Sequence, residues 1–394
     1  MKRTMMAAAA ATALLAGGAA AQEVRIGVLL GFTGPIESLT PAMAAGAELA
    51  MEEVTESGAL LDGTAMTPVR ADSTCVDSAA ATAAAERLIT SDGVSAIMGA
   101  DCSGVTTAVL QNVALANGVV MISPSATSPA LSVISDDGLF FRTAPSDARQ
   151  GEIVAEILQE KGVSSIALTY TNNDYGKGLA DSIAQNVEEA GGTVTINTPH
   201  EDGKADYYAE VGSLAAAGGE VLVVAGYLDQ GGRGIIRAAL DTGAFDTFYL
   251  PDGMVGQSLP HAIGDGLNGS YGAAPGSTGE NADTFAAMAG EAGFEAGPYA
   301  AESYDAAALM ALAMQKAGST ASADFKGEVM SVANAPGEKI GPGELATGLE
   351  ILANGGEVDY QGATNVELIG PGESAGSYRE IVVEDGGIET VGYR

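Results

Sequence analysis

Residues 94–122 read VSAIMGADCSGVTTAVLQNVALANGVVMI and contain a complete strand–helix–strand unit. Val94–Met98 is a short apolar run bounded by polar residues, which predicts a buried strand. Val105–Ala116 carries apolar residues at helical spacing, and Val119–Ile122 is a second β-branched run. Two such strands separated by one helix are typical of a parallel sheet.

The same alternation extends in both directions from this unit. Before it, strands are predicted at Val24–Leu30 and Thr67–Ala71, and helices at Pro41–Glu56 and Ser78–Ile89. A second series of similar length begins after Phe140-Phe141-Arg142. Its predicted elements are helix Gln150–Glu160, strand Ser165–Tyr170, helix Leu179–Ala190, strand Thr193–Asn197, helix Tyr207–Ala217, strand Val221–Ala225, helix Gly234–Thr242 and strand Phe248–Leu250. The pattern predicts an α/β protein with two doubly wound parallel-sheet lobes.

The last third of the chain has a different character. Helices predominate from about Asn281, the longest being Tyr299–Lys316, and the chain ends in a β-rich tail at Tyr378–Val383 and Ile388–Val391. A chain of 394 residues exceeds what one hydrophobic core normally serves, which also favours two domains. Ligands of doubly wound sheets bind beyond the carboxyl ends of the strands, so the loops directly after strands are candidate binding loops.

Residues 1–21 have the features of a secretory signal peptide. Basic Lys2 and Arg3 precede an Ala/Leu-rich stretch, and Ala19-Ala20-Ala21 suits a cleavage site. The alternative, a membrane anchor, is disfavoured because the apolar run is shorter than the roughly 18–20 residues needed to span. No later segment is long and apolar enough to span, so we expect an exported, soluble protein.

The formal net charge of −34 restricts the partners of this protein. A strongly acidic surface repels nucleic acid and anionic headgroups, so we expect neither as a partner. The carboxylates are dispersed rather than gathered in a block, which favours a role in solubility.

Signals for catalysis and for metal binding are weak. His200 and His261 are the only histidines, each in a polar loop beside proline, and we expect both at the surface. A Gly-x-Gly-x-x-Gly match at Gly264, Gly266 and Gly269 is not preceded by a strand, as a dinucleotide-binding loop would be. No paired His/Cys spacing suggests zinc. We therefore expect a protein that is not an enzyme and has no cofactor and no metal.

Two cysteines, Cys75 and Cys102, each follow a predicted strand. In an exported protein an even pair is typical of a disulfide. Two buried free thiols are the alternative.

Polar loops follow the strands in both series. They are Asp101–Gly104, Ser123–Thr127, Asn172–Gly176, Gly226-Tyr227 and Pro251–Gly253. Small hydroxyl residues and free backbone N–H groups at helix N-termini are good donors to a carboxylate. Each loop alone could be an ordinary turn, because Asn, Asp, Gly and Ser favour turns. Their joint position at strand ends favours a binding site between the lobes.

These loops resemble those of the periplasmic solute-binding proteins of ABC transporters that capture leucine, isoleucine and valine, with the type 1 periplasmic-binding fold. The resemblance extends over nearly the whole mature chain. Its motifs are Ile26-Gly27-Val28, Gly34-Pro35, residues 46–50 (GAELA), residues 72–75 (DSTC), Cys102-Ser103, residues 121–131 (MISPSATSPAL), residues 174–178 (DYGKG) and residues 303–307 (SYDAA).

The resemblance implies a set of ligand-binding residues: Ser103, Ser125, Ala126, Thr127, Tyr175, Tyr227 and Asp252. The hydroxyl and backbone donors of Ser103 and of residues 125–127 would hold the α-carboxylate of an amino acid. Asp252 falls where the family has an acidic residue for the α-ammonium group. The two tyrosines would contribute from the second lobe on closure, and Cys75–Cys102 would be the family's disulfide near the site.

The resemblance also implies how the lobes are assembled. The chain would cross between them three times, through a three-stranded hinge. Lobe 1 would comprise residues 23–142 plus 275–355, and lobe 2 residues 143–274 plus 356–394. The protein would be a periplasmic monomer whose closed form is recognised by the membrane permease of an ABC transporter.

Two departures from the family pattern concern the ligand. The loop after the first strand carries Glu37-Ser38-Leu39 and lacks the aromatic residue often found there. The residue at the ammonium position, Asp252, is one methylene shorter than Glu. Another small solute, such as an amide, urea or an aromatic acid, is therefore the alternative ligand, and a ligand-sensing domain is the alternative role.

Overall fold

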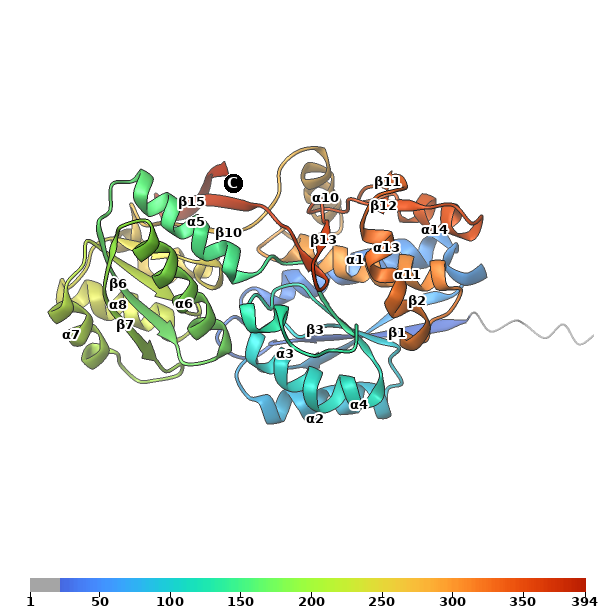
Figure 1. Ribbon diagram of the computed structural model, residues 1–394, viewed down its shortest axis with the longest axis horizontal. Helices are drawn as coiled ribbons and strands as arrows, with labels where there is room; N and C mark the ends of the chain where they lie inside the picture. The colour runs from blue at the N-terminus through green and yellow to red at the C-terminus, as the bar shows by residue number, and fades with distance from the viewer. Residues whose placement is uncertain (1–21) are drawn as a thin grey trace, which may run out of the picture.

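The computed structural model describes residues 22–394, so the predicted signal peptide lies outside the described residues. Figure 1 shows two lobes side by side, each built around a sheet with helices packed on it. Each sheet has seven strands, and a small two-stranded sheet accompanies the first lobe. The two lobes confirm the predicted fold class.

The first sheet has the strand order β13-β14-β5-β4-β3-β1-β2. Its strands are β1 (Glu23–Leu30), β2 (Ala65–Asp72), β3 (Ala96–Gly99), β4 (Val120–Ser123), β5 (Phe140–Arg142), β13 (Leu368–Ile369) and β14 (Glu373–Ser374). The helices of this lobe are α1 (Thr40–Ser57), α2 (Ser78–Thr90), α3 (Ser103–Val109), α4 (Leu115–Asn117), α10 (Glu280–Glu291), α11 (Ala300–Ala317), α12 (Ser322–Phe325), α13 (Val329–Ala333) and α14 (Leu345–Ala353). A π-helical turn, Leu110–Ala114, joins α3 to α4.

The second sheet has the order β16-β15-β10-β9-β8-β6-β7. Its strands are β6 (Ser165–Thr171), β7 (Thr193–His200), β8 (Val221–Ala225), β9 (Phe248–Leu250), β10 (Tyr271–Pro275), β15 (Tyr378–Glu384) and β16 (Gly387–Tyr393). Its helices are α5 (Asp147–Glu160), α6 (Asp174–Glu189), α7 (Tyr208–Ala217), α8 (Gly231–Thr242) and α9 (Ser258–Ile263).

Five parallel strands in each sheet follow the same doubly wound order. The first runs β2-β1-β3-β4-β5 and the second β7-β6-β8-β9-β10. In each sheet the chain adds strands first toward one edge and then toward the other. The change occurs between β1 and β3 in the first sheet and between β6 and β8 in the second. Crevices at such switch points are where doubly wound sheets bind ligands.

The chain passes between the two sheets at three places: after β5, after β10 and after β14. One predicted lobe boundary is wrong. The segment 356–374 belongs to the first lobe and not to lobe 2, because β12 (Val358–Tyr360) pairs with β11 (Glu338–Ile340), and β14 pairs with β5 of the first sheet. The third crossing lies at 375–377, later than predicted. The strands before it have only two or three residues each, which is too few to show a periodic pattern in the sequence.

Two helices begin earlier than predicted because of capping residues. Helix α6 starts at Asp174, where the Asn173 side chain accepts a hydrogen bond from the Gly176 N–H. Tyr175 therefore lies in the first turn of a helix, not in a loop. Helix α5 starts at Asp147, behind Ser146, which accepts from the Ala148 N–H. Such caps satisfy N–H groups that lack partners within the helix.

Helix α1 packs closely against α11, and Gly46 makes the approach possible. A Cβ atom at Gly46 would lie 2.1 Å from the backbone oxygen of Ala300. We expect Gly46→Ala to lower the free energy of unfolding by about 1–3 kcal/mol, the usual cost of overpacking. Urea denaturation measures this. Gly212→Ala is the matched control: Gly212 is an exposed glycine in α7 with open space around it, and alanine there should stabilise by roughly 0.5–1 kcal/mol. Equal effects at the two positions would contradict the packing.

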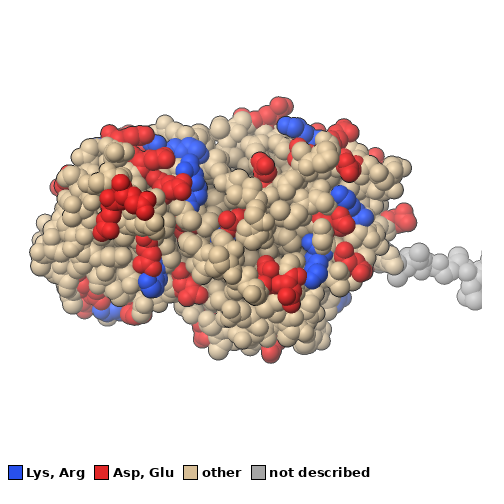
Figure 2. Space-filling model, viewed as in Figure 1, with Lys and Arg blue, Asp and Glu red and all other residues tan. Residues whose placement is uncertain are grey.

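The acidic side chains are spread over both lobes in the face shown in Figure 2, with few basic side chains among them. Within residues 22–394, no helix has the length and apolar character needed to cross a membrane.

Candidate functional site

A small cavity lies between the two lobes, at the carboxyl ends of the parallel strands. Its lining residues are Ile36, Leu39, Asp101, Cys102, Ser103, Ser125, Tyr175, Tyr227, Asp252, Gly253 and Tyr299. Its volume is about 20 Å³, which holds one water molecule. No lysine or arginine is among these residues. Five predicted ligand-binding residues therefore come together: Ser103, Ser125, Tyr175, Tyr227 and Asp252.

Ser103 and Ser125 form the hydroxyl-bearing wall on the first lobe. Ser103 is the first residue of α3, and the preceding Cys102 gives the helix no side-chain cap. The first N–H groups of a helix need external acceptors, so this end favours an anionic group. The Ser125 hydroxyl donates to the backbone oxygen of Asp101 at 3.0 Å, which positions it beside Ser103.

Ala126 and Thr127 were predicted in the same donor set, but neither lines the cavity. Both are buried directly behind Ser125. The Ala126 backbone oxygen accepts from Arg142, and the Thr127 backbone oxygen accepts from the Asp147 N–H at 2.8 Å. In this arrangement the segment 126–127 supports the wall instead of forming it.

Asp252 stands on the opposite wall, in the short 3₁₀ turn Asp252–Met254 that follows β9. Only 2% of its surface is exposed. One carboxylate oxygen accepts from the Tyr175 hydroxyl at 2.7 Å, and the other accepts from the Tyr299 hydroxyl. Tyr299 comes from the first lobe, so its hydrogen bond to Asp252 joins the lobes across the cavity.

The tyrosines around Asp252 form an aromatic wall. The rings of Tyr175 and Tyr227 are stacked with centroids 5.1 Å apart. Burial, followed by the charge of Asp252, raises the pKa of both Tyr175 and Tyr299 well above the usual value. Both phenols therefore stay protonated and can donate to the carboxylate.

The cavity is also lined by Tyr299, Ile36 and Leu39, which were not predicted, and by Asp101, which belongs to the candidate loop Asp101–Gly104 but not to the predicted ligand set. Tyr299 precedes α11 with a φ of 62°, a left-handed conformation that is rare for tyrosine and often marks functional sites. No sequence pattern announces that conformation. Ile36 and Leu39 present apolar side chains from the loop after β1. Glu37, in the same loop, is exposed and does not line the cavity.

Two further buried carboxyl groups lie near the cavity. Asp101 accepts from the Gly31 N–H at 2.6 Å and from the Ser73 hydroxyl at 2.9 Å, and burial raises its pKa. Asp147, at the start of α5, accepts from the Gln150 amide at 2.9 Å. Burial, and then the charge of Asp252, raise the pKa of Asp147 well above its usual value. Gln150 in turn accepts from the Asp252 N–H, so it connects the two acids.

The predicted disulfide is confirmed: Cys75 and Cys102 are bonded, with Cα atoms 5.1 Å apart. It joins the loop after β2 to the loop after β3, on either side of the central strand β1. Cys102 itself lines the cavity, so the bond braces the first-lobe wall.

Contacts outside the cavity also hold the lobes together. The Asp229 carboxylate, in the loop after β8, accepts from the Ser38 N–H at 2.9 Å. The Asp229 N–H donates to the Pro35 backbone oxygen at 3.0 Å. The loop after β1 therefore meets the second lobe directly.

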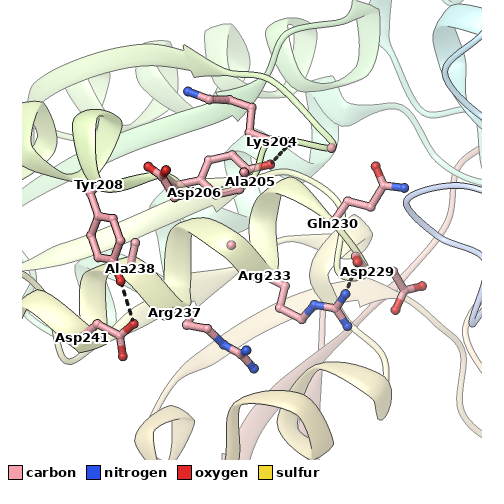
Figure 3. Close-up of a pocket in the computed structure, with 13 residues that line it drawn as sticks. Lys204, Ala205, Asp206, Tyr208, Asp229, Gln230, Arg233, Arg237, Ala238 and Asp241 are labelled. Atoms are coloured by element: carbon pink, nitrogen blue, oxygen red, sulfur yellow. Dashed lines mark hydrogen bonds between the residues drawn. The ribbon is translucent and has the colours of Figure 1, made fainter.

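A larger pocket, of about 410 Å³, lies on the second lobe. Figure 3 shows this pocket, where Lys204, Arg233 and Arg237 lie among Asp206, Asp229 and Asp241. None of the predicted ligand-binding residues lines it. No group of metal-ligating side chains occurs in residues 22–394. His200, expected at the surface, is buried: its ring bonds the Thr169 hydroxyl at 2.9 Å, and burial lowers its pKa to about 4.

Comparison with known proteins gives the family of this chain. A family described as "Periplasmic binding protein" matches residues 23–339. The chain belongs to the periplasmic binding protein family. This is a family of solute-binding proteins, and its members act in the periplasm or outside the cell.

Relatives of this periplasmic binding protein are similar over most of its length. The Leu/Ile/Val-binding protein homolog 1 of Brucella melitensis is 30% identical over 303 residues, which cover 75% of this chain and 79% of the relative. The chemotactic signal transduction system substrate-binding protein BasB of Halobacterium salinarum is 29% identical, over 94% of this chain and 89% of its own.

Solved structures share the fold. The branched-chain amino acid transporter substrate binding protein LivJ from Streptococcus pneumoniae, in complex with isoleucine, superposes with a TM-score of 0.77 at 22% identity, covering 95% of this chain and 99% of LivJ.

Proposed function

We propose that this chain is the substrate-binding component of an ABC importer, and that it captures an aliphatic α-amino acid of the branched-chain type between its lobes. The observation that carries the proposal is the division of polar groups in the cavity. The Ser103 and Ser125 side chains and the first N–H groups of α3 lie on one wall, and the Asp252 carboxylate lies on the other. A zwitterion requires both kinds of group, placed in advance in a dry cleft.

The chemistry of the walls favours an amino acid over the alternative solutes. An amide, urea or an aromatic acid has no ammonium group to neutralise Asp252, and a buried charge without a partner is costly. Ile36 and Leu39 supply apolar surface for an aliphatic side chain. Neither histidine lines the cavity, so no histidine base stands beside the serines, and binding without catalysis is the proposed role. The names of the Brucella and Streptococcus proteins support the same ligand class.

Binding would be coupled to closure of the lobes. An amino acid is much larger than the 20 Å³ cavity, so it can enter only when the walls move apart. The three crossings at 143–146, 276–279 and 375–377 are the natural hinge. The closed form would then present both lobes to the permease. We further propose that the mature protein is a periplasmic monomer that begins near Gln22, after removal of residues 1–21.

A thermal-shift comparison of three related compounds tests this function on the mature protein. Leucine should raise the melting temperature, because ligand at 100 times Kd adds about 2.7 kcal/mol to stability. Its analogue without the amino group, 4-methylpentanoate, leaves Asp252 unpaired, and 3-methylbutylamine lacks the carboxylate. Both should give no shift at the same concentration. A shift with 4-methylpentanoate equal to that with leucine would contradict the role of Asp252.

A further inference from the structure

A second cavity, of about 270 Å³, lies beside the hinge. It forms where the crossing after β10 meets the start of β15, next to the first turn of α11. Its charged lining residues are Glu302, Arg379 and the exposed Asp283, and Ser277, Thr278 and Thr364 add polar groups. Glu302 belongs to a helix of the first lobe and Arg379 to a strand of the second sheet, so the cavity is lined by charged residues of both lobes.

Arg379 has no partner for its guanidinium group. Within residues 22–394 it forms no ion pair, and no other residue accepts a hydrogen bond from its side chain. Burial lowers its pKa. Its aliphatic stem lies close against Gly276, where a Cβ atom would be 3.0 Å from the arginine Cδ. In a chain with 51 acidic residues and 17 basic ones, an arginine held without a carboxylate is unusual.

Glu302 is similarly unpaired. Only 4% of its surface is exposed, and no other residue in the described part of the chain donates a hydrogen bond to its carboxylate. Burial raises its pKa to about 7. The attraction of Arg379 opposes this rise.

We infer that this hinge cavity is a second ligand site, which takes a small zwitterion with its carboxylate on Arg379 and its ammonium group on Glu302. A buried charge is normally paired, yet the buried Glu302 and the partly buried Arg379 line one cavity without an ion pair between them. A guanidinium group binds a carboxylate through two parallel hydrogen bonds, and a carboxylate accepts readily from an ammonium group. A cavity of 270 Å³ accommodates an amino acid with a small side chain.

The hinge site is separate from the interlobe site. Tyr299 is the only residue that lines both cavities, and its hydroxyl points to Asp252 in the interlobe site. The two ligands would therefore lie on opposite sides of one tyrosine. The inference does not depend on the proposed function, because it uses none of the groups that would bind leucine.

Equilibrium dialysis with radiolabelled glycine tests the hinge site, using the mature parent protein and charge-removing variants. Asp252→Asn should retain glycine binding at the hinge. Arg379→Met and Glu302→Gln should each weaken that binding at least tenfold in the Asp252→Asn background. Lys339→Met, which removes an exposed positive charge, is the matched control and should change nothing. Acetate and methylammonium each satisfy only one of the two charges, so neither should displace glycine at equal concentration.

Circular dichroism melting shows whether each variant is folded. If Arg379→Met is not folded, glycine binding to Glu302→Gln tests the hinge site alone. Glycine binding that is abolished by Asp252→Asn alone would overturn the inference, because only the interlobe site would then exist. The absence of glycine binding to Asp252→Asn at millimolar concentration would also overturn it. Displacement by acetate as effective as by glycine would replace the zwitterion site with a simple anion site. Failure of leucine to bind the parent protein would instead reject the proposed function. The glycine measurements would still test the hinge site.

Discussion

Asp252→Asn is expected to weaken amino-acid binding by roughly 30-fold to a few thousandfold. Loss of one partner of a buried charge pair costs about 2–5 kcal/mol, and each 1.4 kcal/mol is tenfold in affinity. Asparagine keeps the size of the side chain and the turn after β9, but it removes the charge. Its one carbonyl oxygen can still accept from Tyr175 or Tyr299, both of which donate to Asp252 in the parent protein.

Titration calorimetry on the parent and the variant measures this effect. The melting temperature without ligand should change little, since the turn and one tyrosine hydrogen bond remain. Asp265→Asn is the control, because it removes the same charge from an exposed turn of the same lobe. A variant at position 252 that binds leucine like the parent would leave Asp252 with only a structural role in its turn.

Loss of the Cys75–Cys102 disulfide should lower the free energy of unfolding by about 3–4 kcal/mol. The bond closes a loop of 27 positions. In the chain-entropy model, closing a loop of this length lowers the entropy of the unfolded chain and so raises its free energy by about 3–4 kcal/mol. The double variant Cys75→Ala/Cys102→Ala removes the bond, and urea denaturation measures the change. Part of the effect should appear as weaker ligand binding, because Cys102 lines the cavity beside Ser103.

Reductant provides the internal control for the disulfide. It should destabilise the parent protein and leave the double variant unchanged. Thiol titration in denaturant should find no reactive group before reduction and two afterwards. Denaturation curves of the parent that coincide with and without reductant would show that the bond contributes nothing to stability.

The fold followed from the sequence because each buried strand is a short apolar run and each helix repeats at its own period. Val94–Ile122 and the series after Arg142 contain enough of that pattern to predict both lobes. Helix starts were harder to place. Asn173 and Ser146 cap α6 and α5 through single side-chain hydrogen bonds, which leave no periodic signal.

The predicted lobe boundary near residue 356 was wrong for a different reason. Strands β12, β13 and β14 have two or three residues each, so their pairing is set by tertiary contacts and not by local pattern. Pattern reasoning works best for long, regular elements. The third crossing of the hinge could therefore be located only from the sheet itself.

The candidate site was partly accessible from the sequence. Ser103, Ser125, Tyr175, Tyr227 and Asp252 all follow strands or begin helices at strand ends, where doubly wound sheets gather their ligands. Tyr299 and Leu39 reach the same cavity from a helix start and from a loop distant in sequence. Only the closed arrangement of the two lobes brings them to Asp252.

The most direct test of the central claim is a crystal structure of the mature protein with leucine. The amino acid should lie between the lobes, with its ammonium nitrogen within hydrogen-bonding distance of the Asp252 carboxylate and its carboxylate at Ser103 and Ser125. Its side chain should contact Ile36 and Leu39. Leucine bound with its carboxylate toward Asp252, or bound outside the interlobe cavity, would contradict the account.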